Sequence, residues 1–279
     1  MDFVKMHGLG NDFVLLGEAA KNPAALSRRL CDRHFGIGAD GLIFVTPSEG
    51  ADFRMRIFNP DGSEPEMCGN GIRCAAKYYV ERRMEGQRDG EFELSVETLA
   101  GKRLVTIARS ADGQVEKVTV DMGEPILEPR EIPARMDGER ALDRPLDVDG
   151  EQFTVSCVSM GNPHCIIFGD SDPKTIDVPE TGSKIENHPA FPNRTNVEFA
   201  WAKSREEVVV RVWERGAGET LACGTGACAT AVAGGLTGRL GERVAVRLPG
   251  GALDIRWAGS GPVFMTGPAV EVFSGSIQV

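Results

Sequence analysis

The sequence predicts an α/β protein of the α+β type, built from two related halves. Its 279 residues allow one large domain or two domains of about 140 residues each. An internal repeat favours two: residues 56–68 read RIFNPDGSEPEMC, residues 211–223 read RVWERGAGETLAC, and the two segments align without a gap. CGNG or CGTG follows, and then an Ala-rich stretch. A period this long indicates duplication of a domain, because solenoid repeats are only about 20–50 residues long.

Alternating apolar and polar residues predict strands in both halves. FRMRIF at 53–58 has this pattern, and EVVVRVW at 207–213 has it in the second half. The N-terminal residues also begin with a strand-like pattern. Further strands are predicted at 42–46, 92–98, 117–121, 153–158, 243–248 and 252–257.

Helices are predicted at 23–33, 69–83 and 224–236, the last two beginning at the repeated glycines. Residues 220–238 carry no charge, but they are mainly Ala, Gly and Thr. Small residues give weak hydropathy for a lipid bilayer, so a helix buried in a protein core is the better interpretation. No membrane association is predicted.

A stretch rich in Pro and charged residues at 123–145 is interpreted as the crossover between the halves. The predicted N-terminal half is therefore 1–122 and the C-terminal half 123–267. Residues 268–279 are expected to return to the first half as a strand.

The composition excludes several classes of function. With 31 Lys+Arg against 41 Asp+Glu, the net charge is −10 and no basic run is present, so nucleic acid is not expected as a partner. The seven cysteines are odd in number and include no Cys-x-x-Cys, which argues against a disulfide framework and against structural zinc. No metal is predicted. Free thiols and an N-terminus without an apolar signal segment indicate a cytoplasmic protein.

Cys68 and Cys223 are expected where a loop becomes a helix. A helix N-terminus carries partial positive charge and unpaired N–H donors. The sequence therefore predicts a lowered thiol pKa at both positions and a place to hold a substrate carboxylate. A thiolate on one face of a carbon alpha to a carboxylate, with a thiol on the other face, can racemise or epimerise that carbon.

Five stretches extend this interpretation: KMHGLGNDFV (5–14), FNPDGSEPEMCGNGIRC (58–74), GNPHCIIF (161–168), TNVEF (195–199) and ERGAGETLACGTGACA (214–229). Through them the sequence resembles the diaminopimelate epimerases, a family of cofactor-independent amino-acid racemases and epimerases. The resemblance implies two pseudo-symmetric halves, each a curled, mainly antiparallel sheet around a central helix, with the active site in the cleft between them. It implies interconversion of LL-2,6-diaminoheptanedioate and its meso form, for lysine and peptidoglycan precursors. It also implies a small diamino dicarboxylate substrate, no cofactor (pyridoxal phosphate included) and a homodimer.

The resemblance also assigns roles to residues. Cys68 and Cys223 become the acid/base pair, with His164 and Glu214 adjusting the pKa of the thiols. Arg215 supplies a bidentate donor for the distal carboxylate, the one at the end of the substrate that is not epimerised. Gly41 departs from the family, since several members carry Gln there. The remaining predicted substrate contacts are Asn11, Asn59, Asn162, Asn196 and Glu214, together with the helix-end positions Gly69, Asn70, Gly224 and Thr225.

Three other functions remain open at this point. One is a related racemase acting on proline or hydroxyproline. A nucleotide-dependent oxidoreductase is suggested by G-x-G-x-x-A at 224–229, although the acid expected after a second strand is missing. A thiol switch using a Cys68–Cys223 disulfide is the third. Structural roles compete too, for example a packed core position for His164 and turn positions for Asn11 and Asn59.

Overall fold

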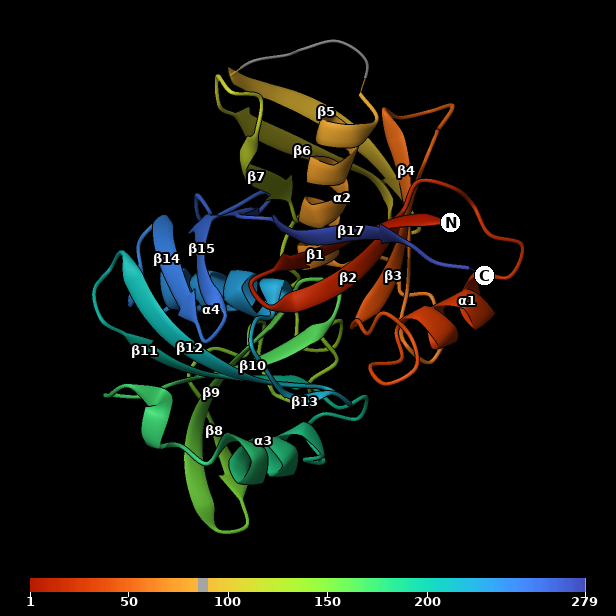
Figure 1. Cartoon of the computed structure of the whole chain (residues 1–279). Coiled ribbons are helices and arrows are strands. Elements are labelled where there is room, and N and C mark those ends of the chain that lie inside the picture. Colours follow the sequence, from red (N-terminus) through yellow and green to blue (C-terminus); the bar gives the residue numbers. More distant parts are fainter. Residues whose placement is uncertain (85–89, 279) are drawn as a thin grey trace. The chain divides into compact units, whose positions relative to one another are not determined.

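The computed structural model describes residues 1–84 and 90–278. They divide into two compact units, one of Met1–Asp121 with the residues from Thr266 on, and one of Met122–Met265. Each unit is rich in sheet and contains few helices (Figure 1). The predicted α/β (α+β) class is therefore confirmed.

In the first unit, strands surround the helix α2 (Gly69–Arg82), which packs against β1, β2, β3, β4, β6 and β7. Because of this position, nearly every α2 side chain up to Val80 is buried. Most strand pairs are antiparallel, and β17 pairs with β1 from Asp2 opposite Ser276 to His7 opposite Val270. The other elements of this unit are β1 (Asp2–Gly8), β2 (Asn11–Leu16), α1 (Pro23–Leu30), β3 (Gly41–Thr46), β4 (Phe53–Phe58), β5 (Gly90–Thr98), β6 (Gly101–Arg109), β7 (Val115–Asp121) and β17 (Val270–Ser276).

The first predicted helix is shorter than expected, since α1 ends at Leu30 and not at residue 33. The side chain of Asp32 accepts hydrogen bonds from the backbone N–H groups of His34 and Phe35, at 2.7 and 2.8 Å. An aspartate that binds the backbone just ahead of it favours a turn over another turn of helix.

In the second unit the central helix is α4 (Gly224–Leu236), as predicted, and β9, β10, β11, β14 and β15 pack against it. Its small side chains let these strands approach closely. No helix among the described residues is both long and apolar enough to span a membrane. The other elements are β8 (Arg144–Val148), β9 (Glu151–Ser159), β10 (Pro163–Phe168), a 3₁₀ turn (Pro173–Thr175), α3 (Val178–Glu186), β11 (Asn196–Ala202), β12 (Glu207–Glu214), β13 (Gly218–Thr220), β14 (Arg243–Leu248), β15 (Gly251–Arg256) and, at the boundary, β16 (Phe264–Gly267).

Strand pairing in the two units follows the sequence repeat. The parallel pair β2–β3 places Phe13 opposite Gly41, and the parallel pair β10–β11 places His164 opposite Asn196. The next strand continues the match. Ile43 lies opposite Ile57 and Glu198 lies opposite Val212, and Ile57 and Val212 are aligned with each other in the sequence repeat. The two halves are therefore pseudo-symmetric, with Ile43 and Glu198 at equivalent positions.

An ion pair is duplicated as well. Arg56 binds Glu64 at 2.7 Å in the first unit, and Arg211 binds Glu219 at 2.6 Å in the second. In both units the arginine lies on a strand, β4 or β12, and the glutamate lies four residues before the repeated cysteine.

Candidate active site

Cys68 is the N-cap residue of α2 and anchors the candidate site of the first half. Its sulfur accepts the N–H of Gly71 at 3.4 Å and donates to Asn11 Oδ1 at 3.9 Å. Asn70 donates to the same oxygen at 3.2 Å. The structure thus brings together three predicted residues, Asn11, Cys68 and Asn70, with Gly69 beginning the helix between them.

Arg73 lies below this group and was not predicted. The side chain is completely buried and binds Asn70 Oδ1, the carbonyl of Gly69 and the carbonyl of Pro268, at 3.0, 3.1 and 3.2 Å. A guanidinium has five N–H donors and no acceptor, so it fixes Asn70 with the carbonyl oxygen inward and the amide N–H₂ toward Asn11.

Asn59 has a structural role of the kind considered above. Its side chain donates to Ser63 Oγ at 2.9 Å, and its backbone N–H binds the Ser63 carbonyl, which closes a turn after β4. These bonds confirm a turn position, and a substrate contact by Asn59 stays a prediction.

Cys223 repeats the position of Cys68 at the start of α4. Its sulfur accepts the N–H of Gly226 at 3.4 Å and lies 3.5 Å from Thr225 Oγ1. The residue is 5% exposed. Gly224 and Thr225 form the first turn of the helix, where backbone N–H groups have no partner inside the helix and are suited to an anion.

A buried polar pair lies beneath this helix start. His164 Nδ1 is 2.7 Å from Glu198 Oε1, and His164 Nε2 is 3.1 Å from Asn162 Oδ1. Both His164 and Glu198 are fully buried. The structure therefore brings together Asn162, His164 and Cys223 as predicted, and adds Glu198.

Glu198 belongs to one of the stretches that carry the resemblance, but no role was assigned to it. The signal was present in the sequence, because Glu198 stands between apolar residues of a strand that is buried from Asn196 to Ala200. A carboxylate is almost never fully buried unless it has a partner, so such a position points to a specific interaction.

The pKa of Cys223 is shifted in the opposite direction from the one that its helix position predicted. Burial raises it well above the ordinary thiol value, and the nearby carboxylates of Glu214 and Glu198 raise it further. Hydrogen bonds from Thr225 and the Gly226 N–H lower it, but by less. The prediction of a lowered pKa is therefore wrong for Cys223, because desolvation and like charge outweigh the helix terminus.

Glu214 lies at the end of β12 and is half-buried. Burial raises the pKa of its carboxyl group, while a hydrogen bond donated by the Thr220 hydroxyl acts in the opposite direction. Its interaction with Cys223 and with His164 places it in the same group of titratable side chains, as a group able to adjust the thiol.

Asn196 and Arg215 form a neighbouring cluster. Asn196 donates to the carbonyl of Pro163 at 2.8 Å and accepts the backbone N–H of Arg215 at 2.9 Å. The Arg215 guanidinium donates to the carbonyl of Asn193 at 3.1 Å. Asn196 thus fixes the backbone at Arg215, and the guanidinium retains donors for a carboxylate.

His164, Glu198 and Cys223 are also residue types that bind metal ions, and their donor atoms lie within 4.8 Å of one another. The hydrogen bond between His164 Nδ1 and Glu198 Oε1 already uses two of these atoms. In this arrangement the cluster fits proton chemistry better than metal coordination.

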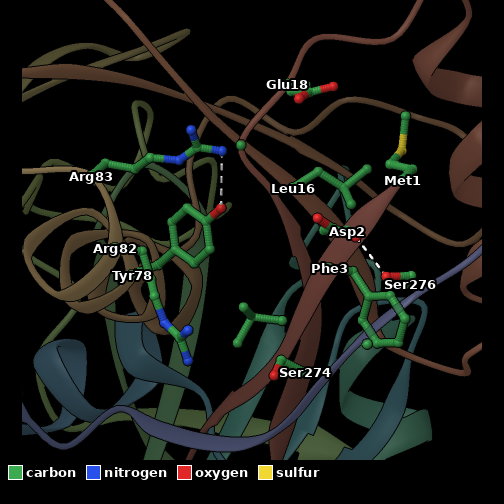
Figure 2. A pocket seen from close by; sticks show the side chains of 13 residues that line it. Met1, Asp2, Phe3, Leu16, Glu18, Tyr78, Arg82, Arg83, Ser274 and Ser276 are labelled. Carbon is green, nitrogen blue, oxygen red and sulfur yellow. Dashed lines mark hydrogen bonds between the residues drawn. The ribbon is translucent and has the colours of Figure 1, made fainter.

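A cavity of about 460 Å³ lies elsewhere in the first unit (Figure 2). Its walls include the start of β1, Tyr78 and Arg83 near the end of α2, and Ser276 of β17. Ser276 donates to Asp2 there, at 2.6 Å. The cavity contains none of the predicted site residues and is at the opposite end of α2 from Cys68.

Comparison with known proteins agrees with the geometry. The family model described as diaminopimelate epimerase matches residues 3–128 and 156–272. The diaminopimelate epimerase of Moorella thermoacetica is 56% identical over 287 aligned positions, covering 100% of both chains. That of Synechocystis is 50% identical over 287 positions, covering 100% of this chain and 99% of the relative.

Solved structures show the same fold at low identity. A hydroxyproline epimerase from Agrobacterium vitis matches with a TM-score of 0.73 and 16% identity, covering 99% of this chain and 91% of that one. A Bacillus anthracis phenazine biosynthesis protein of the PhzF family matches with a TM-score of 0.71 and 18% identity, covering 100% and 99%. The whole-chain matches at 50% identity and above decide the family: this chain belongs to the diaminopimelate epimerases.

Proposed function

We propose that the chain is an isomerase that interconverts LL-2,6-diaminoheptanedioate and the meso isomer, in the synthesis of lysine and peptidoglycan precursors. The observation that carries this is the duplicated helix N-cap cysteine, found in a chain that matches the family along nearly all of its length. The substrate has two amino-acid ends, of which one is epimerised. The reaction transfers protons only and uses no pyridoxal phosphate.

The mechanism uses one sulfur on each face of the alpha carbon. The thiolate of Cys68 removes the alpha proton, and the electron pair passes into the carboxylate, which gains enediolate character. N–H donors of Gly69, Asn70, Gly224 and Thr225 stabilise that charge. Cys223 then delivers its proton to the opposite face, so that one C–H bond is broken and one is formed. Asn11, Asn59, Asn162, Asn196, Glu214 and Arg215 hold the substrate.

The two sulfurs enter this cycle in different protonation states. The raised pKa of Cys223 favours its protonated form, and in this proposal Cys223 is the donor when the LL isomer is the substrate. For the meso isomer the roles are exchanged, and Cys223 must first lose its proton.

Incubation with the LL isomer in D₂O, without pyridoxal phosphate, tests the function. Deuterium should enter one alpha carbon as the meso isomer appears, because the donor thiol exchanges with solvent before it delivers its hydrogen. Mass spectrometry and chiral chromatography measure both. Proline and hydroxyproline serve as the comparison substrates. Turnover of either of them, with none of the diamino dicarboxylate, would assign the chain to the other racemase activity.

We also propose a cytoplasmic homodimer. All seven cysteines are free thiols, as a reducing compartment favours. Strand β17 exposes three large apolar side chains, Val270, Val272 and Phe273, of the kind that association covers. Replacing Val272 by Glu should shift the sedimentation equilibrium from dimer toward monomer. A wild-type monomer at micromolar concentration would contradict the proposed dimer.

A further inference from the structure

The two halves carry different side chains at an equivalent position of the fold, beneath the start of each central helix. Under the helix start of the first half lie apolar side chains: a Cβ atom added to Gly71 would be 3.0 Å from Ile43 Cδ1 and 3.3 Å from Ile57 Cδ1. A Cβ added to Gly226 of the second half would be 2.5 Å from Glu198 Oε1. The same place in the fold therefore holds an isoleucine near Cys68 and a carboxylate near Cys223.

A second difference accompanies the first. Phe13 is the equivalent of His164 in the matching strand registers, so the first half has no counterpart of the His164–Glu198 hydrogen bond. Two apolar residues of one half thus correspond to an interacting acid and base in the other.

We infer that Glu198 is a positioning residue that makes the second half the proton-donating half, by orienting His164 and by placing negative charge beneath Cys223. This inference rests on the proposed epimerase function and specifies how its two sulfurs are made unequal. Glu198 does not contact the substrate in this proposal, but acts through Cys223 and His164.

The environment of Glu198 supports this role. Its Oε1 accepts from His164, while its buried Oε2 has no hydrogen-bond partner among the described residues. A fully buried carboxylate has a strong effect on a neighbouring thiolate, because little solvent screens it. Burying a carboxylate with an unsatisfied oxygen is costly, so its presence beside Cys223 points to a role in the site.

The groups that face Cys223 come from four elements. His164 lies on β10, Glu198 on β11, Glu214 on β12 and Thr225 on α4 itself. The two carboxylates oppose ionisation of Cys223, and Thr225 and the Gly226 N–H favour it. Removing the charge of Glu198 at constant side-chain size should therefore make Cys223 easier to ionise.

The test is Glu198→Gln, with the rate of iodoacetamide alkylation of Cys223 measured from pH 6 to 11 by peptide mass spectrometry. We expect the midpoint of the pH curve to move down by about one pH unit, a tenfold faster reaction below the midpoint. The alkaline limb of kcat/KM for the LL isomer should move in the same direction. Glu207→Gln is the matched control: this carboxylate of the same unit binds Lys203 and Arg247 near the surface, at 3.1 and 3.2 Å, and its loss should leave the midpoint unchanged.

A merely structural role would give a different result. Loosening of the site would raise the alkylation rate at every pH and leave the midpoint where it is, and that outcome would overturn the inference. If Glu198→Gln does not fold, the wild-type curve decides, because a Cys223 midpoint at or below the usual thiol value of about 8.5 would also overturn it. Alkylation is measured without substrate, so a shifted midpoint together with no turnover of the LL isomer would refute the proposed function alone.

Discussion

Epimerisation should fall by a factor on the order of 10³ or more when either Cys68 or Cys223 is replaced by Ala. Each sulfur is the only group proposed to move a proton on its face of the alpha carbon, and general acid–base catalysis alone contributes about 10²–10⁴-fold. The measurement is the rate of meso product formation from the LL isomer, with circular dichroism to confirm that each variant is folded.

Two buried cysteines provide controls on the same helices. Cys74 lies inside α2 and Cys228 inside α4, and both are fully buried. Burial raises the pKa of Cys74 to about 12, which keeps it a neutral thiol. Cys74→Ala and Cys228→Ala should retain most of the activity. Substantial epimerisation by Cys68→Ala or Cys223→Ala would refute the two-sulfur mechanism.

The largest loss of stability is expected for Arg73→Met. The change removes the donor to three oxygens, those of Gly69, Asn70 and Pro268, and the first two of these lie in the interior. Each unsatisfied buried acceptor costs about 1–3 kcal/mol, so we expect the free energy of unfolding to fall by about 3–5 kcal/mol. Urea denaturation measures this as a lower midpoint.

Arg82→Met is the matched control, since Arg82 lies on the same helix. Its exposed guanidinium binds Glu271 at 2.7 Å, and a surface ion pair contributes only about 0–1 kcal/mol. Equal denaturation midpoints for the Arg73 and Arg82 variants would show that the buried network contributes nothing to stability.

The sequence predicted the central helices because their signals are local. Small residues follow each Cys-Gly pair, and α4 has the predicted bounds. The helix α3 was missed, because Pro179 and Gly182 within it are typical of turns. Asp177 accepts the N–H of Glu180 at 3.0 Å and caps the helix, and a Pro in the first turn is compatible with such a start.

The candidate site was predicted as a set of residues, but its electrostatics were not. The N-cap position suggested a more acidic thiol at Cys223, yet burial and two carboxylates from other strands reverse the effect. Such contacts join residues far apart in the chain, so no local pattern contains them. Arg73 was missed for the same reason, since one of its acceptors is the carbonyl of Pro268.

The pairing of β17 with β1 has a consequence for biosynthesis. The second unit is one continuous segment, Met122–Met265, whereas the first unit combines Met1–Asp121 with residues from Thr266 on. On the ribosome, residues 1–121 emerge first but lack their closing edge strand. The second unit is translated later, but all of its strands are present before those of the first unit are. Proteolysis of nascent chains should therefore find the second unit protected from cleavage before the first.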